Sequence, residues 1–180
     1  MPALPRLAWL AILLCCLSLA ARGDDRQRID GNTSRVLDQL RQDVAFAGEL
    51  LDAAAGVLVF PDVVNLTFSE GGKYGEGSLQ VGGAAADYYA TGGTIEGLKR
   101  GTPYMAELIL FMTEEALQSF RDRRSWEVGL HGNVAMIRVD ANGALDPDSL
   151  QGPILGLIYS EAGLSYNLNL DGTRFVRIDR

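Results

Sequence analysis

A glycine-rich segment holds the side chains best suited to binding a ligand. It reads Gly71-Gly72-Lys73-Tyr74-Gly75-Glu76-Gly77 and places an ammonium, a phenol and a carboxylate among four glycines. Such a backbone can offer N–H groups, together with Lys73, to a phosphate or a lipid head group. The alternative is structural, because glycines also allow a strand to bend sharply in a small barrel. Lys73 and Glu76 are equally consistent with an internal ion pair that holds this bend.

A second glycine-rich stretch, residues 92–101, carries a basic pair. Its lysine and arginine are either ligand contacts or part of a solvated surface. The candidate ligand-binding residues of the whole chain are Gly72, Lys73, Tyr74, Gly75, Glu76, Lys99 and Arg100.

Catalytic chemistry has no good candidate in this sequence. His131 is the single histidine and lies in a glycine-flanked turn, which indicates a surface residue. The patterns of a zinc protease, a nucleotide-binding loop and a calcium loop are missing, and the carboxylates could form a glycosidase-like pair only in three dimensions. Glu107 interrupts an apolar run and is either a functional buried charge or an edge residue facing water. We therefore expect no catalytic residues, no metal site, no cofactor and no enzymatic activity.

The N-terminus has the features of a signal peptide. Arg6 precedes the uncharged run from Leu7 to Ala21, which is shorter than the roughly 20 residues of a membrane span. We predict cleavage after Gly23, or alternatively after Ala20, giving a signal peptide of residues 1–23 and one domain of residues 24–180. An uncleaved anchor is the alternative. The expected location is periplasmic or secreted.

Export changes the chemistry of the mature chain. Both cysteines, Cys15 and Cys16, leave with the signal peptide, which excludes disulfides and thiolate sites. A leucine before Cys15 disfavours lipidation. Two arginines and no acid are also lost, so the formal net charge goes from −7 to −9. This charge argues against a nucleic-acid partner and against electrostatic binding to anionic membranes.

Hydrophobic periodicity predicts one long helix that precedes many short strands. The helix begins at Asn32 or Thr33, ends at Gly56 and carries a stripe of apolar residues on one face (Val36, Leu40, Val44, Ala47, Leu51 and Ala54). We expect this face to pack on its own domain rather than on a membrane. Thr113 is expected to cap a short second helix.

The predicted strands are separated by turns. They are residues 57–60, 63–68, 78–81, 87–91, 104–112, 134–139, 154–159, 164–170 and 175–178, with Pro61 ending the first and Asp171-Gly172 joining the last two as a hairpin. The fold class is therefore α+β, with a long N-terminal helix packed on a largely antiparallel curved sheet or barrel of short strands.

Four ordered motifs resemble the SYLF domain, also called the Ysc84 domain. The first joins Ala55–Val64 to Gly71–Gly77, and the others are Leu110–Leu117, Trp126–Gly129 and Gly163–Thr173. The resemblance spans nearly all of residues 24–180.

The resemblance implies lipid binding without catalysis, and in exported bacterial members a place in the cell envelope. Eukaryotic members bind phosphoinositides through a basic N-terminal segment, and some bind actin. Here the N-terminal helix is not basic, so that mechanism is not carried over, and export argues against actin. The expected partner is a lipid or membrane surface. A periplasmic protein-interaction or structural module, bound to another envelope protein, is the alternative.

Overall fold

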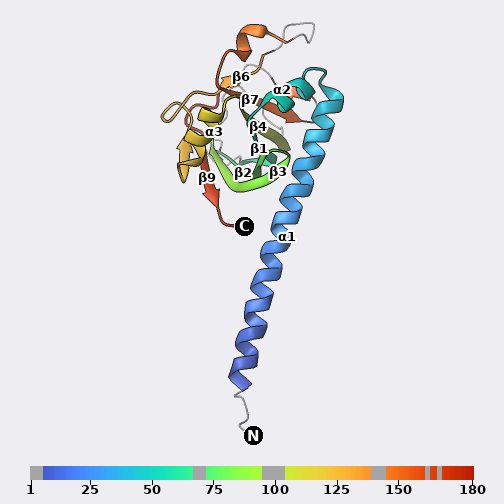
Figure 1. The fold of residues 1–180 in the computed structure, drawn as a ribbon, viewed down its shortest axis with the longest axis vertical. Helices are drawn as coiled ribbons and strands as arrows, with labels where there is room; N and C mark the ends of the chain where they lie inside the picture. Colours follow the sequence, from blue (N-terminus) through green and yellow to red (C-terminus); the bar gives the residue numbers. More distant parts are fainter. Residues whose placement is uncertain (1–5, 67–71, 95–103, 139–144, 161–162, 166–167) are drawn as a thin grey trace.

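The computed structural model describes residues 6–66, 72–94, 104–138, 145–160, 163–165 and 168–180. It is an α+β structure in which helices flank a curled, mixed sheet (Figure 1). The helices are α1 (Arg6–Asp43), α2 (Ala47–Ala53), α3 (Glu114–Arg121) and the 3₁₀ turn η1 (Pro147–Leu150). The strands are β1 (Gly56–Leu66), β2 (Gly72–Val81), β3 (Ala84–Gly93), β4 (Tyr104–Phe111), β5 (Ser125–Glu127), β6 (Ala135–Met136), β7 (Ile154–Ser160), β8 (Gly163–Ser165) and β9 (Arg174–Ile178).

The strands form one sheet in the order β5-β9-β3-β2-β1-β4-β7-β6, with β8 paired to β7. All of these pairings are antiparallel except β6 with β7. The predicted hairpin into β9 is wrong, because β9 pairs with β3 and β5. The predicted strand 134–139 shortens to the two residues of β6.

Two apolar clusters lie on opposite faces of this sheet. The concave face buries aromatic rings, among them Phe60 stacked on Phe175 at 5.5 Å between centroids, and α3 adds Leu117 and Phe120. The opposite face packs against α1 and α2 through residues that include Val57, Leu108 and Leu157. Thr113 caps α3 as predicted, since its side chain accepts a hydrogen bond from the Ala116 N–H at 3.2 Å.

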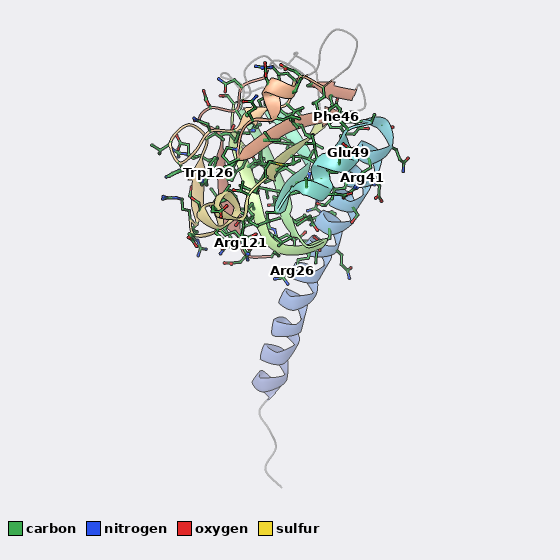
Figure 2. All side chains as sticks on the ribbon, turned by 45° about the horizontal axis from the view of Figure 1, so that its top comes forward. Arg26, Arg41, Phe46, Glu49, Arg121 and Trp126 are labelled. Atoms are coloured by element: carbon green, nitrogen blue, oxygen red, sulfur yellow. The ribbon has the colours of Figure 1, made fainter. Side chains whose placement is uncertain are left out.

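The predicted helix boundaries are wrong in two places. Helical backbone continues N-terminally of Asn32 and Thr33, so neither caps a helix, and Figure 1 shows α1 extending beyond the sheet. The helix then stops at Asp43 and a separate α2 begins at Ala47. Arg41 bridges the break through the Asp52 carboxylate at 2.7 Å. Arg41, Phe46 and Glu49 lie together at this corner in Figure 2, away from Trp126.

The predicted stripe nevertheless packs as one surface. Val36 and Leu40 on α1 and Ala47 and Leu51 on α2 belong to the same buried cluster. Further toward the N-terminus, Ile29 is 2% exposed and Thr33 is buried against Ser78 of β2, with 3.1 Å between the two hydroxyl oxygens. This seam seats α1 on β1 and β2.

Candidate functional site

Lys73 and Glu107 form an ion pair inside the curl of the sheet. Side chains an even number of residues apart on a strand point to the same face of the sheet. Lys73 on β2 therefore shares the concave face with Leu79, and Glu107 on β4 shares it with Ile109 and Phe111. The Lys73 Nζ donates to the Glu107 Oε2 at 2.5 Å across β1, and both side chains are 0% exposed.

This pair settles two alternatives left open by the sequence. Glu107 is buried, so it does not face water at an edge, and the proposed Lys73–Glu76 ion pair is wrong because the two side chains lie on opposite faces of β2. Burial lowers the pKa of the Lys73 ammonium, and the charge and hydrogen bond of Glu107 partly offset this. Lys73 therefore holds strands together and is shielded from a ligand in the solvent.

Pro61 lies at a bulge of β1, where the alternation of inward-pointing and outward-pointing side chains shifts by one residue. The registers with β2 and β4 both shift near this residue, adding one residue to β1. Phe60 points inward before the bulge and Val63 points inward after it. The predicted stop at Pro61 is wrong, since β1 runs through it. A bulge of this kind re-aims side chains and bends the strand, and here it brings Pro61, Asp62 and Val64 to the wall of a groove.

Glycines on β2 make room for this bulge. A Cβ on Gly77 would lie 1.9 Å from the Val59 carbonyl oxygen, and one on Gly75 would lie 2.9 Å from the Val63 side chain. Both glycines are therefore needed for close approach of β1 and β2. From Gly72 onward the glycine-rich segment is part of the bent strand β2, in agreement with the structural interpretation.

Tyr74 and Glu76 lie on the outer face of β2. The Tyr74 hydroxyl donates to the Glu76 Oε1 at 2.7 Å, and Arg180 donates to both Glu76 oxygens, with 3.1 Å from Nε to Oε2. Burial and the hydrogen bond to Glu76 raise the pKa of Tyr74, and the bond to Glu76 raises the pKa of Arg180. Tyr74 is 47% exposed, and its hydroxyl is held by Glu76.

A groove of about 340 Å³ lies between α1 and the β1–β2 pair. It contains three of the predicted ligand-binding residues, Tyr74, Gly75 and Glu76. Its other lining residues are Arg28, Ile29, Asn32, Pro61, Asp62 and Val64. The Asn32 amide donates to the Asp62 Oδ2 at 2.6 Å across the groove wall. We take this groove as the candidate site.

The sequence did not single out the α1 wall of the groove. Arg28 and Asn32 lie four residues apart, which is the helical spacing that puts two side chains on one face. That signal was present, but the helix was expected to begin only at Asn32 or Thr33, which left Arg28 outside it. Lys73 lies away from the groove, and Lys99 and Arg100 fall outside the described residues.

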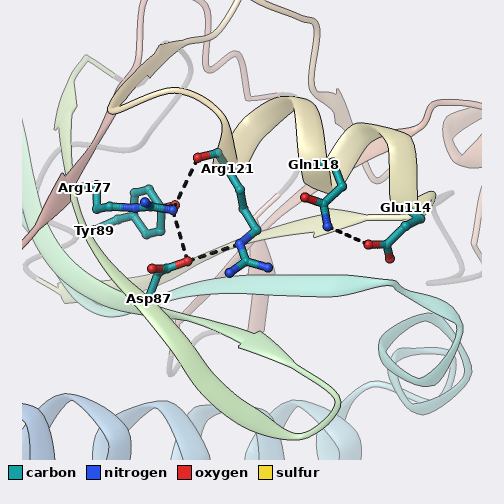
Figure 3. A network of polar contacts seen from close by, with 6 residues as sticks. All are labelled: Asp87, Tyr89, Glu114, Gln118, Arg121 and Arg177. Carbon is teal, nitrogen blue, oxygen red and sulfur yellow. Dashed lines mark hydrogen bonds and ion pairs between the residues drawn. The ribbon is translucent and has the colours of Figure 1, made fainter.

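A second polar cluster joins α3 to the sheet (Figure 3). The Asp87 Oδ2 accepts from the Arg121 Nε at 3.2 Å and from the Arg177 Nη2 at 3.1 Å. Arg177 also donates to the Arg121 carbonyl and the Tyr89 hydroxyl. These contacts join strand β3, strand β9 and helix α3, so the cluster fastens the three elements to one another.

His131 contacts the backbone of its own turn and a tryptophan ring. Its Nδ1 accepts a hydrogen bond from the Glu127 N–H at 2.9 Å, which closes the turn, and its ring packs on Trp126.

Within the described ranges no three His, Cys, Asp or Glu side chains gather as metal ligands would. None of the helices in the described part of the chain is both long and apolar enough to cross a membrane. The chain matches no protein-family model and no curated protein.

Proposed function

We propose that this chain is an exported, non-enzymatic lipid-binding domain of the bacterial envelope. Its ligand would be a lipid at a membrane surface, held in the groove between α1 and the β1–β2 pair. The finer description that goes with this proposal is a SYLF-like domain whose long N-terminal helix packs on the curled sheet. Cleavage after Gly23 would begin the mature chain with Asp24, one turn before Arg28 of the groove.

The observation that carries the proposal is the mixed lining of the groove. Ile29, Pro61, Val64 and the half-exposed Tyr74 ring supply apolar surface, and charged groups stand around it. Small-molecule sites have this composition and volumes of about 300–1,000 Å³. At about 340 Å³ the groove suits a head group and its first carbons better than two whole acyl chains.

Vesicle co-sedimentation tests the proposal. We expect the exported protein to sediment with neutral or anionic vesicles. Tyr74→Ala should weaken sedimentation severalfold, because the ring is the largest exposed apolar group of the groove. Leu130→Ala is the matched control: Leu130 is 69% exposed and is not among the residues lining the groove.

The result that would overturn the proposal is a folded protein that sediments with no vesicle of either kind. If the Tyr74 and Leu130 variants lost sedimentation equally, lipid binding would stand but its site would not be the groove.

A further inference from the structure

The groove holds a cation and an anion about one helical turn apart. Arg28 and Asn32 are separated by four residues of α1, about 6 Å along its axis. Asn32 hydrogen-bonds Asp62, so the Asp62 carboxylate lies at the level of Asn32. The Arg28 guanidinium and the Asp62 carboxylate therefore mark two ends of the same groove.

These two charges are available to a ligand. The one ion pair of Arg28 among the described residues is with Asp25 at 3.6 Å, and both side chains are about half exposed, so the pair adds little. Asp62 is exposed, and Asn32 occupies one of its two oxygens. Glu76, in contrast, accepts hydrogen bonds from Tyr74 and Arg180.

The groups around the two charges are already positioned. The Asn32 Oδ1 accepts from the Arg35 Nη2 at 2.5 Å while its amide nitrogen donates to Asp62, which fixes the orientation of the amide. The Tyr74 hydroxyl is tied to Glu76, which holds the exposed ring in the groove wall. An aromatic face attracts ammonium groups, most strongly when they are partly desolvated.

We infer that the groove selects the head group of a zwitterionic phospholipid, a phosphate joined to an ammonium. The phosphate would bind Arg28, and the ammonium would lie against Asp62 and the Tyr74 ring. This inference rests on the proposed function and names its ligand class. A head group carrying only negative charge would meet the Asp62 and Glu76 carboxylates and, after cleavage at Gly23, a chain whose formal net charge is −9.

The test uses the protein recovered from an exporting host, with three vesicle types. These are phosphatidylcholine, phosphatidylcholine with phosphatidylethanolamine, and phosphatidylglycerol. We expect tighter binding to the two zwitterionic compositions than to phosphatidylglycerol. Arg28→Ala should weaken zwitterionic binding about tenfold, the size of one lost charge-assisted hydrogen bond. Arg124→Ala, which removes an exposed arginine on the α3 side, should leave it unchanged.

A second variant separates the two ends of the groove. Asp62→Asn keeps an acceptor for Asn32 and removes the charge, so it should weaken zwitterionic binding while strengthening binding to phosphatidylglycerol. If the substitution only disturbed the structure, binding to the zwitterionic vesicles and to the phosphatidylglycerol vesicles would both fall. Asp122→Asn, an exposed acid at the end of α3, is its matched control. Soluble phosphocholine should compete only weakly, because it lacks the membrane surface.

The other possible outcomes of these vesicle experiments each overturn a particular claim. Binding to phosphatidylglycerol as tight as to the zwitterionic vesicles, or Arg28 and Asp62 variants that match their controls, would overturn this inference and leave lipid binding standing. Free phosphocholine bound as tightly as vesicles would replace the membrane with a soluble ligand. Folded protein that binds no vesicle would overturn both the inference and the proposed function.

Discussion

At the scale of single residues, the buried Lys73–Glu107 pair is the most consequential contact of the domain. Taking two charges out of water is costly, and the pair joins β2 to β4 across the bulged β1. The Glu107 Oε1 has no hydrogen-bond partner among the described residues. Each charge is therefore tolerated in the interior only because the other is present.

Removing one member should destabilise the fold strongly. We expect Lys73→Met to lower the free energy of unfolding by about 3–5 kcal/mol, because it leaves the Glu107 carboxylate buried without a counter-charge. The double variant Lys73→Met/Glu107→Leu should regain most of that loss. Urea unfolding followed by Trp126 fluorescence measures both.

The control is an exposed pair of the same charge type. Arg41→Met breaks the Arg41–Asp52 pair, whose side chains are 41% and 71% exposed, and should cost less than about 1 kcal/mol. If Lys73→Met proved as mild as Arg41→Met, the buried pair would not exist as described.

The sequence identified the chemistry of these residues better than their partners. Glu107 stood out because a charge inside an apolar strand needs an explanation, and it is indeed buried. Its partner could not be found from the sequence, because Lys73 and Glu107 meet only through the registers of β2 and β4 on β1. The same dependence on register explains why Glu76 pairs with Arg180 and not with Lys73.

At the scale of elements, β1 and β2 depend on each other's irregularity. Pro61 lacks the N–H of a regular ladder, so β1 bulges there, and the glycines of β2 let the bent strand approach. We predict that Gly77→Ala lowers the free energy of unfolding by at least about 3 kcal/mol, since the backbone oxygen of Val59 cannot move aside.

Gly92 on the neighbouring strand β3 is the matched control. The nearest atom to its added Cβ would be the Lys73 carbonyl oxygen at 3.9 Å. Gly92→Ala should therefore be neutral or slightly stabilising. Thermal unfolding of the two variants compares them directly, and equal stability would mean that β1 and β2 are farther apart than described.

The break between α1 and α2 has a contact of its own. The Tyr159 hydroxyl on β7 donates to the Asp43 carboxylate at the last residue of α1. This hydrogen bond, helped by burial and the Asp43 charge, raises the pKa of Tyr159 to about 12 from an ordinary value near 10. The neutral phenol is the form that the fold stabilises.

The pH dependence follows from that direction. The folded pKa is raised, so the stabilisation, about 1.5–3 kcal/mol for a bond to a charged acceptor, is fully present below pH 10 and is lost as the pH rises through about 12. Tyrosinate absorbance, taken as wild type minus Tyr159→Phe, should show one phenol titrating near pH 12. Asp43→Asn should move that midpoint toward 10, and an unchanged midpoint would contradict the contact.

The boundaries of the helices were the hardest feature of the fold to predict from the sequence. The apolar stripe identified the buried face correctly, with Val36, Leu40, Ala47 and Leu51 in one cluster. The break after Asp43 has no glycine or proline to announce it. Arg41 binds Asp52 and Tyr159 binds Asp43 at this break, and both are tertiary contacts that the sequence does not reveal. Thr113, a local cap with acids in the first helical turn, needed no such contact and was predictable.

At the scale of the whole molecule, the proposed cleavage would change the charge of the chain but not the residues that build its fold. The seam of α1 on the sheet uses residues from Ile29 onward, including Thr33, Val36 and Leu40. None of these falls within residues 1–23, so removal of a signal peptide would leave the seam and the groove with all their residues. The domain would keep its structure and lose two arginines.

We predict that protein recovered from an exporting host begins at Asp24, or at Ala21 if the alternative site is used. Intact mass measurement distinguishes these from the full chain. Thiol labelling gives an independent check, because Cys15 and Cys16 are the two cysteines of the sequence and both precede either cut. The processed protein should react with no thiol reagent even when unfolded, whereas a retained N-terminus should react at two positions.

Labelled, full-length protein in a membrane fraction would instead favour an uncleaved N-terminal anchor. The proposed lipid binding would then be measured on a chain that is already attached to a membrane. In that case the Arg28 and Asp62 variants, rather than total sedimentation, would report on the groove.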